Sequence, residues 1–280
     1  MGQRATRRVW LLTDERYLKQ RMPRVLADEL ARAGCAVQIV NADGVVAQVG
    51  VDPWAGLAEG DVLVARTRSS FGLTLLRAAE RTDGVAVIPS WDSVTHVRNK
   101  ARAVETLAAH DIPMPRTLLA QSPAGLKDVP ADDFPLLLKP HLGDNAGGIV
   151  LVRHPLELDD LTWREGLVVA QEFVDSGSVD LKLYGVGDQL WAVRRPSPLA
   201  RSRGPAPPPE LVEVTPAFEE IALACRDAFG LELYGVDVLD SPRGPLVVDV
   251  NEFPNYTGVP EAPRAIAELV RSLPKEKVAA

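Results

Sequence analysis

The first 95 residues alternate between short apolar runs and segments whose apolar residues recur at helical spacing. The helical spacing covers 22–33 and 73–80. The apolar runs of strand length cover 9–13, 37–40, 61–65 and 85–88. Strands that alternate with helices are typical of a parallel sheet covered by helices, and such sheets bind ligands beyond the carboxyl ends of their strands. We therefore expect a parallel α/β domain, with Arg66 and Arg68 at its crevice.

After residue 95 the pattern changes to strands that follow one another with short turns between them. A helix is expected over 96–109, ended by the proline-containing segment 111–115, and further helices are expected over 218–229 and 262–273. The expected strands cover 117–120, 134–139, 149–152, 167–174, 179–186, 190–194, 233–239 and 246–250. Turns such as Gly187-Asp188 join neighbouring strands into hairpins. This part is therefore predicted to be α+β, mainly antiparallel sheet with helices packed on it.

The strongest chemical signal is a pair of apolar strands near the C-terminus that carry isolated polar residues. Asp249 and Asn251 point to one face because side chains alternate along a strand, and Asp237 on the preceding strand can share that face. Two carboxylates and an amide oxygen suit Mg²⁺, and adjacent buried carboxylates are costly without a cation. The alternative is a set of solvated strand ends, but the flanking residues are strongly apolar, so we expect a metal site.

Two lysines and a glycine-rich loop are candidates for holding phosphate. Lys139 ends a run of leucines, where a lysine is seldom placed without an anionic partner. The loop 143–148 would let backbone N–H groups approach phosphate oxygens, although a plain β-turn explains it equally well. Its glycines are Gly143, Gly147 and Gly148. Lys100 opens a helix and, taken alone, is explained as a solvated lysine. The chain contains no P-loop sequence.

The strands that follow add further polar candidates. One apolar strand ends in Gln171, Glu172, Phe173 and Val174. Backbone groups at this strand end could meet the edge of an adenine ring. Taken alone, Glu172 is an exposed strand-end residue. Asp180 and Lys182 share a face of the next hairpin, where a cross-strand salt bridge is an equally good explanation. Alternation puts Arg194 and Arg195 on opposite faces, so only one of them can face a given site.

Composition and charge disfavour several classes of protein. The 280-residue chain has a net charge of −7, whereas proteins that bind nucleic acids usually have a basic excess. Only Cys35 and Cys225 occur, so neither a disulfide framework nor a cysteine zinc site is expected. No apolar run reaches the roughly 20 residues that span a bilayer, and the N-terminus is too polar for a secretory signal. We expect a cytoplasmic protein that binds neither nucleic acid nor membranes.

Taken in order along the chain, these motifs resemble the ATP-grasp superfamily. The motifs are Asn99-Lys100, 111–117, 138–140 with the glycine-rich loop, 171–173, 180–182, Asp237 and 249–251. The resemblance covers about residues 60 to 275 and implies ATP and one or two Mg²⁺ ions as cofactors. It also implies three parts: an N-terminal pre-ATP-grasp α/β domain (1–95), a small lid subdomain (96–174) and a C-terminal subdomain with the metal site (175–280).

The resemblance further implies a role for each candidate residue. The residues implied in nucleotide binding are Lys100, Lys139, Gly143, Gly147, Gly148, Gln171, Glu172, Phe173, Val174 and Asp180. The implied metal ligands are Asp237, Asp249 and Asn251. Lys182 and Arg195 would face the transferred phosphoryl group and the acceptor. The acceptor would approach from the N-terminal domain, through Arg66, Arg68 and Asn255.

Two branches of the superfamily remain open at this point. RimK-type and glutathione-synthetase-like ligases join a carboxylate to an amine through an acyl phosphate, whereas inositol-trisphosphate 5/6-kinase-like enzymes phosphorylate a hydroxyl. Asp249-Val-Asn251, in place of the Glu-x-Asn common in ligases, and Arg195-Pro-Ser197 look more like the kinases. The acidic chain is poorly suited to an inositol polyphosphate, and its alanine-, arginine- and proline-rich composition suggests a bacterial source, where ligases are commoner.

We therefore predict a Mg-ATP-dependent carboxylate–amine ligase that acts on a small-molecule or peptide acceptor. The kinase is the alternative. A non-catalytic nucleotide-binding protein is disfavoured because the lysine and metal-ligand set is complete. The resemblance also suggests a homodimer or tetramer.

Overall fold

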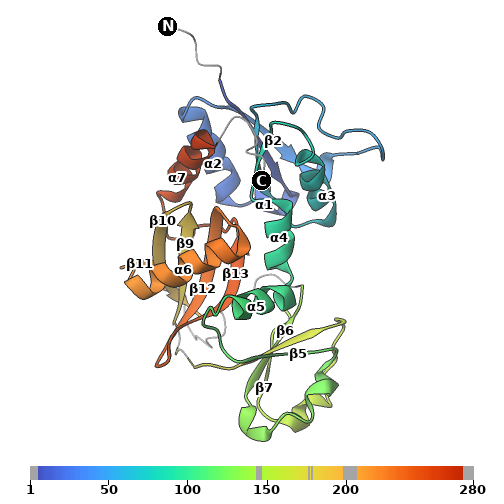
Figure 1. The fold of residues 1–280 in the computed structure, drawn as a ribbon, viewed down its shortest axis with the longest axis vertical. Coiled ribbons are helices and arrows are strands. Elements are labelled where there is room, and N and C mark those ends of the chain that lie inside the picture. The colour runs from blue at the N-terminus through green and yellow to red at the C-terminus, as the bar shows by residue number, and fades with distance from the viewer. Residues whose placement is uncertain (1–5, 143–146, 176, 178, 198–206, 274–280) are drawn as a thin grey trace.

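The computed structural model describes residues 6–142, 147–175, 177, 179–197 and 207–273. Within these ranges the chain forms three β-sheets with their own helices, arranged along the long axis of the molecule (Figure 1). A parallel α/β part followed by an antiparallel α+β part is the fold class that the sequence predicts, and the prediction is confirmed. None of the helices in the described ranges has both the length and the apolar character needed to cross a membrane.

The N-terminal sheet is parallel, with strand order β2-β1-β3-β4. Its strands are β1 (Arg8–Thr13), β2 (Ala36–Asn41), β3 (Val62–Arg66) and β4 (Ala86–Ile88). The helical segments are α1 (Glu15–Leu18), α2 (Arg21–Arg32), the 3₁₀ turn η1 (Ala42–Gly44) and α3 (Ser70–Ala79). All of β3 is buried, as expected for a central parallel strand covered on both faces. The chain leaves β3 at Arg66, and Arg68 in the loop that follows contacts Glu252, in the third sheet along the chain.

The single helix expected over 96–109 is in fact two helices, α4 (Trp91–Arg98) and α5 (Lys100–Ala109), so this prediction is wrong. The residue between them, Asn99, is extended, with φ −88° and ψ 97°, and its side chain accepts a hydrogen bond from the backbone N–H of Arg102. An asparagine that satisfies a free N–H in this way starts a new helix. The break places Lys100 in the first turn of α5. The expected domain boundary between residues 95 and 96 falls inside α4.

The second sheet is antiparallel, with strand order β5-β8-β6-β7, and lies at one end of the molecule (Figure 1). Its strands are β5 (Thr117–Ala120), β6 (Leu136–Pro140), β7 (Val150–Val152) and β8 (Val168–Glu172). Short 3₁₀ turns connect them: η2 (Pro123–Leu126), η3 (Ala131–Asp133) and η4 (Pro155–Leu158). Leu136, Leu138 and Val168 belong to a core that this sheet forms with its own loops. We refer to it as the lid sheet.

The third sheet is antiparallel, with strand order β11-β10-β9-β12-β13. Its strands are β9 (Val179–Val186), β10 (Gln189–Pro196), β11 (Glu210–Val212), β12 (Leu233–Ser241) and β13 (Gly244–Glu252). The helices are α6 (Pro216–Phe229) and α7 (Ala262–Ser272). The hydroxyl of Thr215 caps the start of α6, and Gly230 ends it in the left-handed conformation, with φ 59°.

Helix α7 joins the third sheet to the N-terminal domain. It packs against α2 and β9 (Figure 1). One continuous core contains Leu26 of α2, Val186 of β9 and Ile266 of α7. Because the two parts share this core, the loop after β3 has a fixed position relative to β12 and β13.

The register between β9 and β12 depends on a glycine. Gly185 is paired with Tyr234 in the ladder, and Tyr234 is fully buried. A Cβ on Gly185 would lie 1.9 Å from Cζ of the Tyr234 ring. That separation is far inside van der Waals contact, so the ring occupies the space that any larger residue at position 185 would need.

Gly185→Ala is expected to lower the free energy of unfolding by about 1–3 kcal/mol or more, because overpacking forces β9 and β12 apart. Urea unfolding measures the change. The matched control is Gly44→Ala, since a Cβ there meets no atom within 4 Å; its effect should stay within about 0.5 kcal/mol. Equal stabilities for the two variants would contradict this packing.

Candidate active site

Three polar side chains converge on the adjacent strands β12 and β13. The ladder sets Asp237 of β12 directly opposite Asp249 of β13. Nδ2 of Asn251 lies 3.2 Å from Oδ2 of Asp237 and 3.4 Å from Oδ2 of Asp249. The structure thus brings together the three residues that strand alternation places on one face.

Three cationic side chains neutralise the two carboxylates. Nζ of Lys182 lies 2.8 Å from Oδ2 of Asp237, and Nη2 of Arg195 lies 2.6 Å from Oδ1 of the same residue. Nζ of Lys100 lies 2.5 Å from Oδ1 of Asp249. Lys182 thus forms a cross-strand salt bridge with Asp237 on β12, whereas the sequence suggested such a bridge within the hairpin 179–194. Lys100 is not a solvated lysine, because it pairs with a residue on β13.

Local features of β10 and β12 direct these cations toward Asp237. Alternation along β10 separates Arg195 from Arg194, whose Nη1 lies 3.6 Å from Oε2 of Glu210 on β11. Lys182 crosses β12 at Gly235, where a Cβ would lie only 2.9 Å from Cε of the lysine. The glycine therefore provides the space through which the lysine reaches the aspartate.

The donor set fits a hard divalent cation. Asp237, Asp249 and Asn251 offer carboxylate and amide oxygens, which Mg²⁺ prefers. A half-turn of the Asn251 amide exchanges its nitrogen for its oxygen at nearly the same position. Among the described residues, no group of three or more His, Cys, Asp or Glu side chains could hold a metal. The asparagine would therefore be the third protein donor to a cation at this point, beside water or phosphate oxygens.

Asp249 is ionised in this environment. Burial by itself opposes its ionisation, but the positive charges of Lys100, Lys139 and Lys182 hold the pKa of its carboxyl below the ordinary value. The carboxylate is thus available to a metal at neutral pH.

Lys139 is a buried cation at the end of β6. Its Nζ donates to Oε1 of Gln171 at 2.5 Å and to the carbonyl oxygen of Val248 at 3.2 Å, and neither partner is charged. Burial lowers the pKa of Lys139 to about 8, against the opposing effect of the Asp249 charge. The contact with Val248 also joins the lid sheet to β13.

These groups line a cavity of about 880 Å³ between the lid sheet and the third sheet. The sequence-predicted residues that line it are Lys100, Lys139, Gly147, Gln171, Glu172, Phe173, Val174, Asp180, Lys182, Arg195, Asp237, Asp249 and Asn251. Its apolar lining includes Leu137, Ile149, Leu151 and Leu239, which sequence reasoning did not single out. Gly148 is not among the lining residues; its φ is 76°, and it lies against Pro140. Gly143 lies outside the described residues.

The side chain of Glu172 connects the lid sheet to the third sheet. Its Oε1 lies 2.9 Å from Nη2 of Arg243, in the turn between β12 and β13, and its Oε2 accepts a hydrogen bond from the backbone N–H of Arg116. Glu172 is therefore more than the exposed strand-end residue of the simpler interpretation. Arg243 was missed because a turn residue at this spacing carries no motif.

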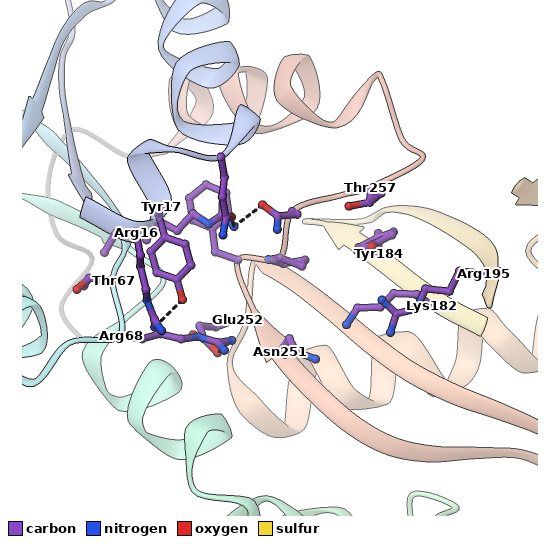
Figure 2. Close-up of a pocket in the computed structure, with 16 residues that line it drawn as sticks. Arg16, Tyr17, Thr67, Arg68, Lys182, Tyr184, Arg195, Asn251, Glu252 and Thr257 are labelled. Atoms are coloured by element: carbon purple, nitrogen blue, oxygen red, sulfur yellow. Dashed lines mark hydrogen bonds and ion pairs between the residues drawn. The ribbon is translucent and has the colours of Figure 1, made fainter. Parts of the chain in front are cut away.

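A smaller, polar cavity of about 190 Å³ lies between the N-terminal domain and the third sheet; we call it the acceptor chamber (Figure 2). All three residues predicted to meet the acceptor line it: Arg66, Arg68 and Asn255. Lys182, Arg195 and Asn251 line both this chamber and the larger cavity. The two cavities thus meet at the residues that hold or adjoin Asp237.

Arg66 and Arg68, two of the four arginines that line the chamber, are held by neighbouring residues. Arg68 makes a bidentate ion pair with Glu252, with Nε at 2.6 Å and Nη2 at 3.0 Å (Figure 2). Nη2 of Arg66 donates to Oε1 of Gln20 at 2.7 Å and to Oδ1 of Asn255. Burial lowers the pKa of Arg66 to about 10, so its guanidinium stays charged at neutral pH. Glu252 was missed because alternation places it on the face opposite Asn251.

Asp14, at the end of β1, fixes the loop that carries Arg68. Its carboxylate accepts hydrogen bonds from the hydroxyls of Thr67 and Ser69 and from the backbone N–H groups of Arg68 and Ser69. Burial works against the charge of Asp14, but these hydrogen bonds keep the pKa of the carboxyl below its usual value. The available signal was a carboxylate directly after a buried parallel strand.

Comparisons with known proteins show which family the chain resembles. A family model described as a RimK-like ATP-grasp domain matches residues 97–262, more than half of the chain. A curated protein of Shewanella amazonensis, named probable alpha-L-glutamate ligase 2, is 31% identical over 219 residues, which cover 72% of this chain and 71% of that protein.

Two solved structures share the fold over nearly the whole chain. A RimK domain protein ATP-grasp from Sphaerobacter thermophilus has a TM-score of 0.74 at 19% identity, covering 94% of this chain and 97% of its own. The ATP-grasp ligase PsnB, solved with a minimal precursor, Mg and ADP, has a TM-score of 0.70 at 15% identity, covering 97% and 98%. From the family match and the identity to its relative, the chain belongs to the RimK-like ATP-grasp family.

Proposed function

We propose that this ATP-grasp enzyme is a carboxylate–amine ligase that forms an acyl phosphate and releases ADP. The observation that carries the proposal is the junction of the two cavities at Lys182, Arg195 and Asn251. A cavity large enough for a nucleotide meets a polar chamber large enough for a small substrate, or for the end of a peptide, at the side chains that surround Asp237.

In this proposal ATP occupies the larger cavity. Glu172 and the backbone after it lie at the adenine end, beside the apolar side chains of that cavity. Lys100 and Lys139 hold the phosphates. The surroundings of Lys139 support this role, because its hydrogen-bond partners are neutral. A buried cation in such surroundings is strongly stabilised when a phosphate binds beside it. Asp180, Gly147 and Gly148 are assigned to the same nucleotide site.

Asp237, Asp249 and Asn251 would hold one or two Mg²⁺ ions. When bound, Mg²⁺ neutralises the phosphate charge that develops during phosphoryl transfer. Lys182 and Arg195, now paired with Asp237, would face the transferred phosphoryl group and the acceptor carboxylate. Catalysis then consists mainly of positioning and charge stabilisation by these side chains.

The chemistry has two steps. An oxygen of the acceptor carboxylate attacks the γ-phosphorus of ATP, the bond to the β–γ bridging oxygen breaks, and ADP leaves. The amine then attacks the carbonyl carbon of the acyl phosphate, inorganic phosphate leaves with the bonding electron pair, and the amine loses a proton to give an amide. The acceptor chamber would hold the reacting groups at the junction, excluding water from the acyl phosphate.

The kinase alternative finds no support in the comparisons. The relative at 31% identity and PsnB are both named ligases. The Asp-x-Asn sequence at 249–251, which looked kinase-like, supplies the same oxygen donors as Glu-x-Asn. A homodimer or tetramer and a cytoplasmic location stay predictions from the sequence.

With Mg-ATP and a panel of carboxylates and amines, the enzyme is expected to release ADP and phosphate in equal amounts. Mass spectrometry should detect an amide, and hydroxylamine in place of the amine should trap the acyl phosphate as a hydroxamate. Lys182→Met should lower the rate at least about 100-fold, because it removes charge stabilisation at the junction. A product heavier by one phosphoryl group would refute the ligase.

Without nucleotide, Lys139→Met is expected to stabilise the protein at pH 7. The pKa of Lys139 falls from 10.5 to about 8 in the fold, so its charged form costs about 3 kcal/mol of folding free energy below pH 8. The cost disappears as the pH rises from about 8 to 10.5, because above this range the lysine is neutral in both the folded and the unfolded state.

Urea unfolding between pH 7 and 10.5 tests the Lys139 prediction. The stability difference between the variant and the wild type should shrink as the pH rises, and the variant should no longer bind ATP. Lys127→Met is the matched control, since Lys127 is half exposed and pairs with Asp159 on the surface; its difference should not follow the same curve. Identical pH dependence for both variants would contradict a buried charged lysine.

A further inference from the structure

The cations around the acceptor chamber differ in whether a carboxylate balances them. Lys182 and Arg195 are paired with Asp237. Arg16 also lines the chamber, and its Nε lies 3.9 Å from Oδ2 of Asp14. Each of these cations therefore has an internal counter-charge.

Arg66 is the exception among the described lining residues. Its only hydrogen bonds are to the neutral side chains of Gln20 and Asn255, and its Nε and Nη1 have no partner among the described residues. The guanidinium lies 4.8 Å from the ring centroid of Tyr17 and 5.6 Å from that of Phe253, and only 8% of the residue is exposed.

Among the described residues, no carboxylate forms an ion pair with Arg66. The charge of Glu252 acts on it through space, but both oxygens of Glu252 are already bonded to Arg68. A buried cation without a direct ion-pair partner is costly, so the chamber favours one anionic group from a substrate.

Arg68 does not offer a second anionic position. Both oxygens of Glu252 are engaged by its guanidinium, and the side chains are 16% and 6% exposed. The pair lines the chamber (Figure 2). A second carboxylate beside this pair would approach the negative charge of Glu252, which is strongly unfavourable. It could not bind Arg68 in compensation, because the guanidinium already donates to both oxygens of Glu252.

We propose that the chamber takes an α-amino acid with one carboxylate and an uncharged side chain, and that Glu252 is the residue that excludes the dicarboxylate counterpart. The α-carboxylate balances Arg66, and the amino group is directed toward the junction with the larger cavity. The inference rests on the proposed ligase function. The proposed substrate differs from glutamate, the amino acid in the name of the relative at 31% identity, a probable alpha-L-glutamate ligase.

Binding of isosteric amino-acid pairs tests the proposal. The pairs are glutamine with glutamate and asparagine with aspartate, measured by calorimetry with Mg²⁺ and a non-hydrolysable ATP analogue present. The wild type should bind the neutral member at least about tenfold more tightly. In Glu252→Gln, the ratio of the two dissociation constants should shift at least about tenfold in favour of the acidic member, because the change removes the repulsion and releases Arg68.

Two further variants separate charge from structure. Glu252→Asp keeps the carboxylate and should keep the wild-type preference. The double variant Arg68→Gln with Glu252→Gln should lose the gain for glutamate, because it lacks the released guanidinium. Glu268→Gln is the matched control: its carboxylate lies 3.3 Å from Nε of Arg264 on the exposed face of α7, and it lines neither cavity. It should leave the ratio unchanged.

Equal binding of glutamate and glutamine by the wild type, an unchanged ratio in Glu252→Gln, or binding of neither pair would overturn the proposal. These results are distinct from a failure of the ligase function. Amide formation with ADP release but without the preference removes only the inference about Glu252. Absence of ADP release with every carboxylate and amine removes the ligase function itself.

Discussion

The candidate site depends on the repulsion between two aspartates that an antiparallel ladder sets side by side, Asp237 on β12 and Asp249 on β13. Like charges directly opposite in a sheet are destabilising. The free protein balances them with Lys182, Arg195 and Lys100. These cations come from β9, from β10 and from the first turn of α5. The need to neutralise two carboxylates therefore gathers side chains from separate parts of the chain at one point.

The same electrostatic balance connects the two cavities. In the proposed function, a metal–nucleotide complex would offer a cation to the aspartates and phosphate oxygens to the cations that pair with them in the free protein. Lys182 and Arg195 also line the acceptor chamber, so a change in their pairing would act on a substrate bound there. The proposed selectivity of the chamber rests on the same kind of pairing, because Glu252 is bonded to Arg68 while Arg66 has only neutral hydrogen-bond partners.

Strand periodicity was enough to predict Asp237, Asp249 and Asn251 as neighbours, because a two-residue repeat fixes which side chains share a face. It could not predict the role of Glu252, which lies on the other face and forms an ion pair with Arg68, 184 positions away in the sequence. The break at Asn99 was missed for a local reason: the capping hydrogen bond outweighed a continuous helical pattern. Contacts between distant segments leave no periodic trace, so the chamber's internal pairs emerged only from the structure.

The most direct test of the central claim is to count divalent cations at the aspartate pair. Mn²⁺ can replace Mg²⁺ as a paramagnetic probe, and its binding with and without ATP can be followed by electron paramagnetic resonance. The account predicts one or two Mn²⁺ ions bound in the presence of ATP by the wild type, and binding weakened at least about tenfold in Asn251→Ala, which removes the third oxygen donor. Equal Mn²⁺ binding by the two proteins would contradict it.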